Sequence, residues 1–126
     1  MCRLFWAFSM VAFVAACNPT GSTNPHIVFF TADSAQLDDA AKNVIADAAV
    51  AAQRSPGKPV VVAGFADPTG GPAYNRALSE ARAQIVADAL RNAGVVPSRI
   101  SVQPRGPVRP EGYATESRRV EIRIGM

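Results

Sequence analysis

Apolar and polar residues follow two different periods along the chain. Residues 118–124 alternate, with Val120, Ile122 and Ile124 on one face, which is typical of a strand with one buried side. Residues 38–54 instead place apolar side chains three and four positions apart, as an amphipathic helix does. The complete pattern predicts strands over residues 26–30, 59–66, 99–103 and 118–124, and helices over residues 38–54 and 72–93.

Turn-forming residues separate these elements. The sequence SPGK ends the first helix at residues 55–58, and Gly94 follows the second helix as its stop. Residues 104–117 are rich in Pro and Gly and predict a loop. The resulting order, β-α-β-α-β-β, predicts an α+β fold, an α/β two-layer sandwich with both helices packed on one face of a mixed sheet. We expect one domain over residues 26–126.

The first residues have the pattern of an export signal. Arg3 is followed by an apolar run from Leu4 to Ala16, which is shorter than the roughly 20 residues of a bilayer span. The run ends in VAAC, which resembles the lipobox of bacterial lipoproteins and implies a lipid on Cys17. We expect a lipoprotein signal peptide over residues 1–16, then lipidated Cys17 and a polar tether over 17–25. The alternative is an ordinary cleaved signal with a chance cysteine.

Composition excludes several classes of function. Thirteen Lys and Arg residues against ten Asp and Glu give no dense basic patch for nucleic acid. His26 is the only histidine, so a zinc site with three or four ligands is not expected, nor any cofactor. Ser79 has no histidine base nearby, which argues against a serine hydrolase. We expect Phe29, Phe30 and Phe65 to lie in the core rather than to form a platform for sugars.

The second helix places an arginine beside its apolar stripe. At about 100° per residue, Leu78, Ile85 and Ala89 define the expected buried direction, and Arg82 lies about 40° from Leu78. A partly buried guanidinium needs an anionic partner, and Asp67, at the end of the preceding strand, is the nearest candidate. Two interpretations remain open: an internal Asp67–Arg82 salt bridge that holds the fold, or a site that binds a ligand.

Neighbouring residues favour a ligand. The turn DPTGG presents backbone N–H groups beside a helix N-terminus, where a carboxylate binds well. Arg118 has the same parity as Val120 and therefore points to the helix-covered face. Asn75 and Thr69 add neutral hydrogen-bonding groups. A small zwitterion would fit, with its carboxylate bidentate on Arg82 and its ammonium on Asp67.

Three stretches resemble one known family. They are VFFTADSAQL at residues 28–37, GFADPTGGPAYNRALSEARAQIVADAL at 64–90 and SRRVEIRI at 117–124. The middle stretch is similar to the pattern G-x-T-D-x-x-G-x-x-x-x-N-x-x-L-S-x-x-R-A of OmpA-like, peptidoglycan-associated domains. The resemblance covers residues 27–125, nearly all of the chain after the predicted signal.

The resemblance implies a module that binds peptidoglycan through the meso-diaminopimelate of its stem peptide. The chain departs from the family at Phe65-Ala66, where the family has His-Thr or Tyr-Thr, at Pro68, and at Ser117, where the family has Asn. The family's binding positions correspond here to Asp67, Arg82, Asn75, Thr69, Arg118 and, in the first loop, Asp33.

The expected function is therefore a non-catalytic tether between membrane and cell wall. Its lipid on Cys17 would lie in the outer membrane, because Asn18 is not the acidic residue linked to inner-membrane retention, and its domain would lie in the periplasm. We expect Asp67→Ala or Arg82→Ala to abolish binding with folding retained. The alternative is an envelope protein–protein interaction module using the same groove, for secretion, motility or a Tol-like assembly. A cell-wall enzyme is disfavoured, since the sequence offers no nucleophile–base pair.

Overall fold

The structure is a computed structural model that describes residues 24–125. The predicted signal peptide, Cys17 and the tether up to residue 23 lie outside the described residues. Within residues 24–125, no helix is both long and apolar enough to cross a bilayer.

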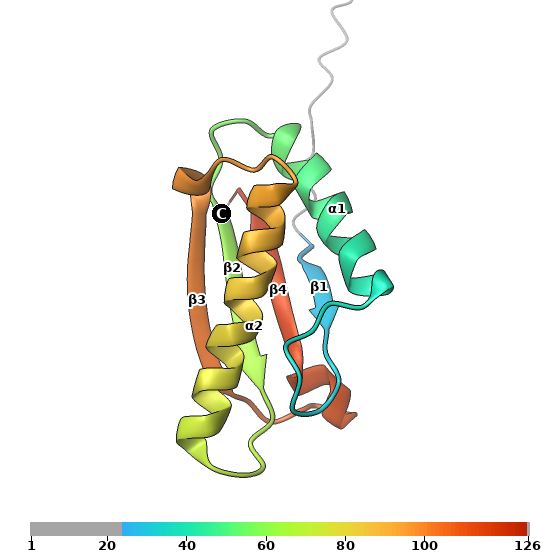
Figure 1. Cartoon of the computed structure of the whole chain (residues 1–126), viewed down its shortest axis with the longest axis vertical. Helices are drawn as coiled ribbons and strands as arrows, with labels where there is room; N and C mark the ends of the chain where they lie inside the picture. The colour runs from blue at the N-terminus through green and yellow to red at the C-terminus, as the bar shows by residue number, and fades with distance from the viewer. Residues whose placement is uncertain (1–23, 126) are drawn as a thin grey trace, which may run out of the picture.

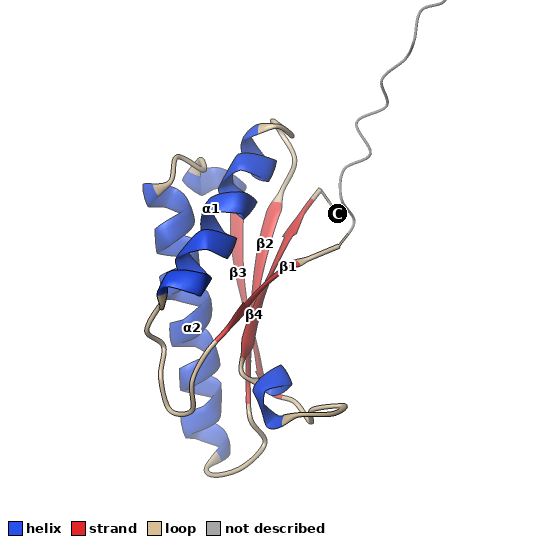
Figure 2. Ribbon diagram, turned by 90° about the vertical axis from the view of Figure 1, so that its right-hand side faces the viewer, coloured by secondary structure: helices blue, strands red, loops and turns tan. Residues whose placement is uncertain are grey.

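Two long helices cover one face of a four-stranded sheet (Figures 1 and 2). The strand order is β1-β4-β2-β3; β4 is antiparallel to both of its neighbours, and β2 and β3 are parallel. This arrangement confirms the predicted fold. The elements are β1 (His26–Phe29), α1 (Asp39–Gln53), β2 (Val60–Ala66), α2 (Pro72–Asn92), the 3-10 helix η1 (Pro97–Arg99), β3 (Ile100–Pro107), the 3-10 helix η2 (Ala114–Ser117) and β4 (Arg119–Ile124).

A capping side chain and a glycine-containing turn set the two ends of helix α1. The Asp38 carboxylate accepts a hydrogen bond from the Ala41 N–H at 2.7 Å and so caps the first turn. After the helix, Gly57 adopts φ 77°, a conformation that glycine adopts without strain. Alanine predominates on the buried face, which lets the helix lie close to its neighbours. The buried residues of α1 are Ala41, Ile45, Ala48, Ala49 and Ala52.

Helix α2 buries a different face from the one predicted. Leu78 and Ala89 are only half-buried and Ile85 is exposed, so the direction that they define is wrong. The reason is the close approach of α2 to β2 at Gly64, where an added Cβ would overlap the Ser79 carbonyl oxygen. A helix that lies against a glycine must turn its small residues toward the sheet. The buried residues are Asn75, Ser79, Arg82, Ala83, Val86, Ala87 and Leu90.

Strand β3 is longer than predicted, because it continues to Pro107 instead of ending at Gln103. Pro104 and Pro107 are tolerated since β3 is an edge strand, where a missing N–H leaves no neighbour unpaired. Its register with β2 shifts between Gly64 and Phe65. Part of the predicted loop over residues 104–117 is therefore strand.

The sheet face opposite the long helices has a charged row on β4. The Nε of Arg119 donates to Glu121 Oε1 at 2.9 Å, and Nη2 of Arg123 donates to Glu121 Oε2 at 2.6 Å. Burial by itself raises the pKa of Glu121, but the hydrogen bonds from Arg123 and Arg119 outweigh it and hold that pKa below its usual value. The ionised carboxylate thus stabilises the fold.

We expect Glu121→Gln to lower the free energy of unfolding at neutral pH by roughly 1–2 kcal/mol, because the charge-assisted hydrogen bonds that Arg119 and Arg123 donate to this carboxylate are weakened. A carboxyl group whose pKa is lowered in the folded state stabilises it above the unfolded-state pKa of about 4.3, and this contribution disappears as the pH falls through the folded-state value. Urea unfolding at neutral and acidic pH measures the effect. A difference between the two proteins that stays constant down to about pH 2 would refute this account.

Candidate functional site

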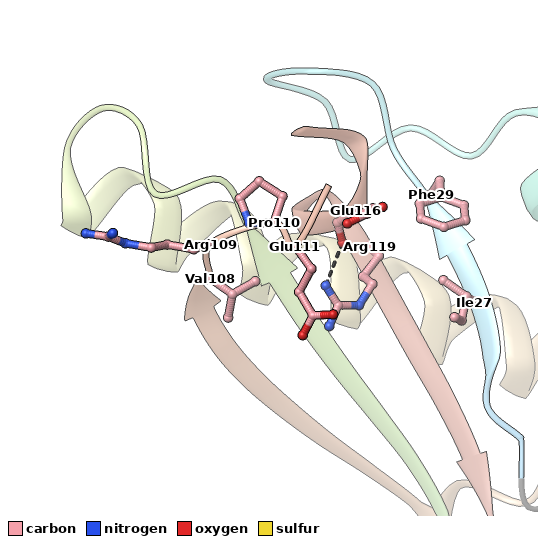
Figure 3. A pocket seen from close by; sticks show the side chains of 8 residues that line it. All are labelled: Ile27, Phe29, Val108, Arg109, Pro110, Glu111, Glu116 and Arg119. Atoms are coloured by element: carbon pink, nitrogen blue, oxygen red, sulfur yellow. Dashed lines mark hydrogen bonds between the residues drawn. The ribbon is translucent and has the colours of Figure 1, made fainter. Parts of the chain in front are cut away.

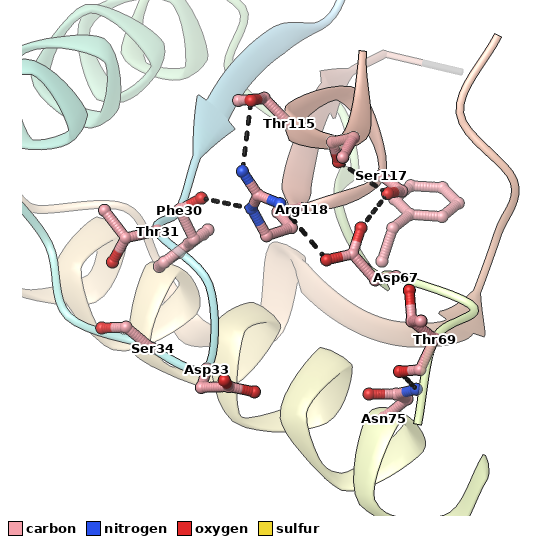
Figure 4. A network of polar contacts seen from close by, with 12 residues as sticks. Phe30, Thr31, Asp33, Ser34, Asp67, Thr69, Asn75, Thr115, Ser117 and Arg118 are labelled. Atoms are coloured by element: carbon pink, nitrogen blue, oxygen red, sulfur yellow. Dashed lines mark hydrogen bonds and ion pairs between the residues drawn. The ribbon is translucent and has the colours of Figure 1, made fainter. Parts of the chain in front are cut away.

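The predicted site residues gather at one end of the sheet, the lower end in Figure 1. Three segments meet there: the loop between β1 and α1, the turn between β2 and α2, and η2 with the start of β4 (Figure 4). Figure 4 labels five of the six candidates: Asp33, Asp67, Thr69, Asn75 and Arg118. The sixth, Arg82, lies in α2 and bonds to the β1–α1 loop and to β2.

Asp67 forms its ion pair with Arg118. Nη1 of Arg118 lies 3.3 Å from Asp67 Oδ2, and the Ser117 hydroxyl lies within hydrogen-bond distance of Oδ1. Arg118 also donates to the Phe30 carbonyl at 3.3 Å and to the Thr115 hydroxyl at 3.2 Å, as Figure 4 shows. The Asp67 and Arg118 side chains are 25% and 18% exposed. The pair is therefore held in place and still open to solvent.

Arg82 has no exposed surface at all and bonds to backbone carbonyls. Its Nε donates to Ser34 O at 2.9 Å, Nη1 to Phe65 O at 3.3 Å and Nη2 to Thr31 O at 3.1 Å. The guanidinium carbon lies 5.3 Å from the centre of the Phe30 ring. The carbonyls come from the β1–α1 loop and from β2, so Arg82 joins both segments to α2.

This geometry corrects one sequence interpretation. An internal Asp67–Arg82 salt bridge is not formed, since Asp67 pairs with Arg118 and the three carbonyls occupy the Arg82 guanidinium. A ligand also cannot make the expected bidentate contact with Arg82 in this conformation, because the Arg82 side chain is fully buried. Carbonyls from two separate segments converge on the guanidinium, and only the folded backbone brings them together.

The charge on Arg82 is incompletely compensated. Burial lowers its pKa, Asp67 raises it from a distance and Arg118 lowers it again. Among residues 24–125, no carboxylate lies within ion-pair distance of Arg82. Carbonyl dipoles solvate a cation without cancelling its charge, so Arg82 remains a buried positive charge close enough to Asp67 and Arg118 to interact with both. A guanidinium has five N–H groups, and the described residues supply acceptors for three of them.

The other candidates support the turn and the loop around this pair. Asn75 is buried and donates to the Thr69 carbonyl at 2.8 Å, which fixes the β2–α2 turn. The Tyr74 hydroxyl lies 3.4 Å from Asp33 Oδ1, and Asp33 itself has φ 53°. Thr69 and Asp33 are exposed at the rim. Asn75 thus positions the turn, whereas Thr69 and Asp33 are exposed to solvent beside it.

Sequence reasoning missed the role of Ser117. This residue is fully buried, and its hydroxyl lies within hydrogen-bond distance of both Asp67 and the Ala114 carbonyl at 2.8 Å. The signals were its position beside Arg118 and its departure from the family's Asn, and both are weak.

Comparison with known proteins gives consistent results. Residues 29–123 match the model of the OmpA family. The probable lipoprotein YiaD of Escherichia coli K12 is 40% identical over 107 residues, which are 79% of this chain and 48% of that protein. The peptidoglycan-associated lipoprotein of Legionella pneumophila is 42% identical over 73 residues, covering 53% of this chain and 42% of that protein. The chain thus spans less than half the length of these two relatives.

A solved structure has the same fold. The crystal structure of the peptidoglycan-associated lipoprotein from Burkholderia pseudomallei matches with a TM-score of 0.71 and 24% sequence identity. The match covers 79% of this chain and 89% of that one. At this identity the likeness concerns the fold.

Proposed function

We propose that this chain, which belongs to the OmpA family, is a non-catalytic lipoprotein that binds peptidoglycan and tethers the outer membrane to the cell wall. The names of its relatives and the lipobox-like sequence ending at Cys17 support an anchor in the membrane. The domain over residues 26–126 would then extend into the periplasm from a tether of a few residues.

The observation that supports binding most directly is the accessible Asp67–Arg118 pair above a buried cation. The side chain of diaminopimelate ends in an ammonium and a carboxylate on one carbon. Such a zwitterion can insert into an ion pair and give each charged residue a new partner of opposite sign. One internal pair is replaced by two intermolecular pairs.

Each residue has a separate role in this proposal. Asp67 binds the ammonium, and Arg118 is the arginine that the carboxylate reaches first. Arg82 is buried and attracts the carboxylate through its charge rather than by direct contact. Thr69 and Asp33 contact the ligand from the rim, and Asn75 holds the turn.

We expect Asp67→Asn to weaken binding of a diaminopimelate-containing tripeptide by about 30-fold or more, since losing one partner of a desolvated charge contact costs about 2–5 kcal/mol. The substitution keeps the shape and removes only the charge, so folding is retained. Calorimetric titration of the full-length chain in detergent, with co-sedimentation on isolated sacculi, measures the effect.

Asp88→Asn is the matched control, because Asp88 lies on α2 in an exposed pair with Arg91. It should bind as the wild type does. An Asp67→Asn variant with wild-type affinity would refute the proposed role of this carboxylate. A wild-type chain that ignores sacculi but captures a defined envelope protein would favour the interaction module instead.

A further inference from the structure

A second concave site lies on the sheet face away from the long helices. It is a pocket of about 320 Å³ between β1 and the segment that follows β3, with the start of β4 as its floor (Figure 3). This volume is at the lower end of the range of small-molecule sites, about 300–1,000 Å³. The lining residues are Ile27, Phe29, Val108, Arg109, Pro110, Glu111, Glu116 and Arg119.

The wall on the β1 side is a flat aromatic surface. Phe29 is 47% exposed, whereas its neighbours Val28 and Phe30 are buried under the helices, as the alternation of a strand requires. The prediction that Phe29 belongs to the core is therefore wrong. Phe29 and Ile27 form one apolar wall, and Val108 and Pro110 lie across the pocket from them (Figure 3).

The floor is a fixed arginine. The guanidinium carbon of Arg119 lies 4.2 Å from the centre of the Phe65 ring, and its Nε donates to Glu121 at 2.9 Å. Its Nη1 also donates to the Glu116 carbonyl. These contacts hold the guanidinium in one orientation, so its remaining N–H groups are preorganised for a ligand.

Two glutamates, Glu111 and Glu116, line the pocket together with Arg119. The Glu111 side chain is exposed and points toward Arg119 in Figure 3, while the Glu116 carboxylate accepts from the Gly112 N–H at 2.8 Å. The lining contains two arginines and two glutamates, so neither sign of charge is in excess. Such a site suits a neutral ligand with both donors and acceptors better than a simple ion.

We propose that this pocket binds a sugar ring of a glycan. A pyranose has one apolar face of C–H groups, which packs on an aromatic ring, and a rim of hydroxyls that bond to planar guanidinium and carboxylate groups. A purely apolar ligand would desolvate the Glu111 carboxylate and the N–H groups of Arg119 that are not bonded to Glu121 or Glu116. The inference rests on the proposed function for the source of the sugar, an N-acetylhexosamine of the peptidoglycan strand.

The two sites meet at the start of β4. Arg118 points to the helix-covered face and pairs with Asp67, whereas the next residue, Arg119, points to the opposite face and into the pocket. Stem peptide and sugar are covalently joined in peptidoglycan. A ligand that passes around this end of the sheet can therefore occupy both sites.

Titration of the isotope-labelled full-length chain in detergent micelles, followed by two-dimensional NMR, tests the inference. One ligand is the disaccharide of N-acetylglucosamine and N-acetylmuramic acid without peptide, and the other is the tripeptide containing diaminopimelate. We expect the disaccharide to shift the amides of Phe29, Glu111 and Arg119, with a Kd near the millimolar level that a contact energy of about 4 kcal/mol gives.

Variants at Phe29 separate recognition from folding. Phe29→Ala should weaken disaccharide binding at least about tenfold, a loss of about 1.4 kcal/mol, and leave tripeptide binding unchanged. Phe29→Trp retains an aromatic face and should still bind. Tyr113→Ala is the control, because Tyr113 is 80% exposed and does not line the pocket.

A disaccharide that shifts no pocket amide, or that binds Phe29→Ala as tightly as wild type, would overturn the inference. The two ligands test the sugar site and the diaminopimelate site separately. If the disaccharide binds and the tripeptide does not, the sugar site stands and the diaminopimelate site fails. The reverse result refutes the sugar site alone.

Discussion

Replacing Arg82 by alanine is expected to lower the free energy of unfolding by about 3–5 kcal/mol. The side chain is fully buried, and its guanidinium satisfies carbonyls from the β1–α1 loop and from β2. Its removal takes the Arg82 donors away from three partly buried carbonyls and opens a cavity. Urea unfolding followed by circular dichroism measures the change.

Arg76→Ala is the matched control, because Arg76 is an exposed arginine on the same helix. It should change stability by less than about 0.5 kcal/mol. Arg82→Lys should fall between the two, since an ammonium keeps the charge and three donors but lacks the planar reach of the guanidinium. If Arg82→Ala unfolds like Arg76→Ala, the carbonyl contacts do not hold the fold together.

This result would change how binding data are interpreted. The sequence led us to expect that Arg82→Ala abolishes ligand binding in a folded protein. Because the buried guanidinium also holds this loop, a loss of binding in this variant would combine partial unfolding of the β1–α1 loop with the loss of the Arg82 charge. Asp67→Asn and Arg118 variants, which act on partly exposed groups, are therefore the cleaner probes of recognition.

Replacing Gly64 by alanine is the second change with a large expected effect. The new Cβ would overlap the Ser79 carbonyl oxygen and lie 2.9 Å from Ala83 Cβ. Both groups belong to the buried face of α2, so the helix must move away from β2. We expect a loss of at least about 2 kcal/mol, within the range for overpacked cores, and a Tm lower by roughly 10 °C.

Gly71→Ala is the control for the loss of a glycine. Its Cβ would meet only Tyr74 Cβ, at 3.9 Å, which is an ordinary contact. Its cost should stay below about 1 kcal/mol, the usual effect of a poorer helix cap. Thermal unfolding of the two variants, followed by circular dichroism, decides the question. Equal Tm values would show that the space between α2 and β2 can accommodate a Cβ at residue 64 without loss of stability.

A displacement of α2 would also affect the proposed diaminopimelate site. Arg82 lies on the buried face of the same helix, one turn from Ser79, and Asn75 holds the turn that presents Asp67. Helix–sheet spacing and ligand geometry thus depend on the same contact. A Gly64→Ala protein that still folds should bind the tripeptide more weakly than the Gly71→Ala control.

Periodicity and turn residues are local properties, so they predicted the helices and strands correctly, except that β3 continues to Pro107. The sequence by itself also indicated that Arg82 is buried and that Asp67, Asn75 and Arg118 belong to one region. These conclusions required only spacing along the chain. The residues of the turn also indicated Thr69, and the family motif added Asp33.

Only the tertiary structure decided which groups become partners. Whether Asp67 pairs with Arg82 or with Arg118 depends on the carbonyls of Thr31, Ser34 and Phe65, which come from two distant segments and occupy Arg82. The buried face of α2 depends on how closely β2 approaches, which hydrophobicity does not encode. The exposed position of Phe29 likewise follows from the side of the sheet that the helices cover, a choice made by packing between elements rather than within them.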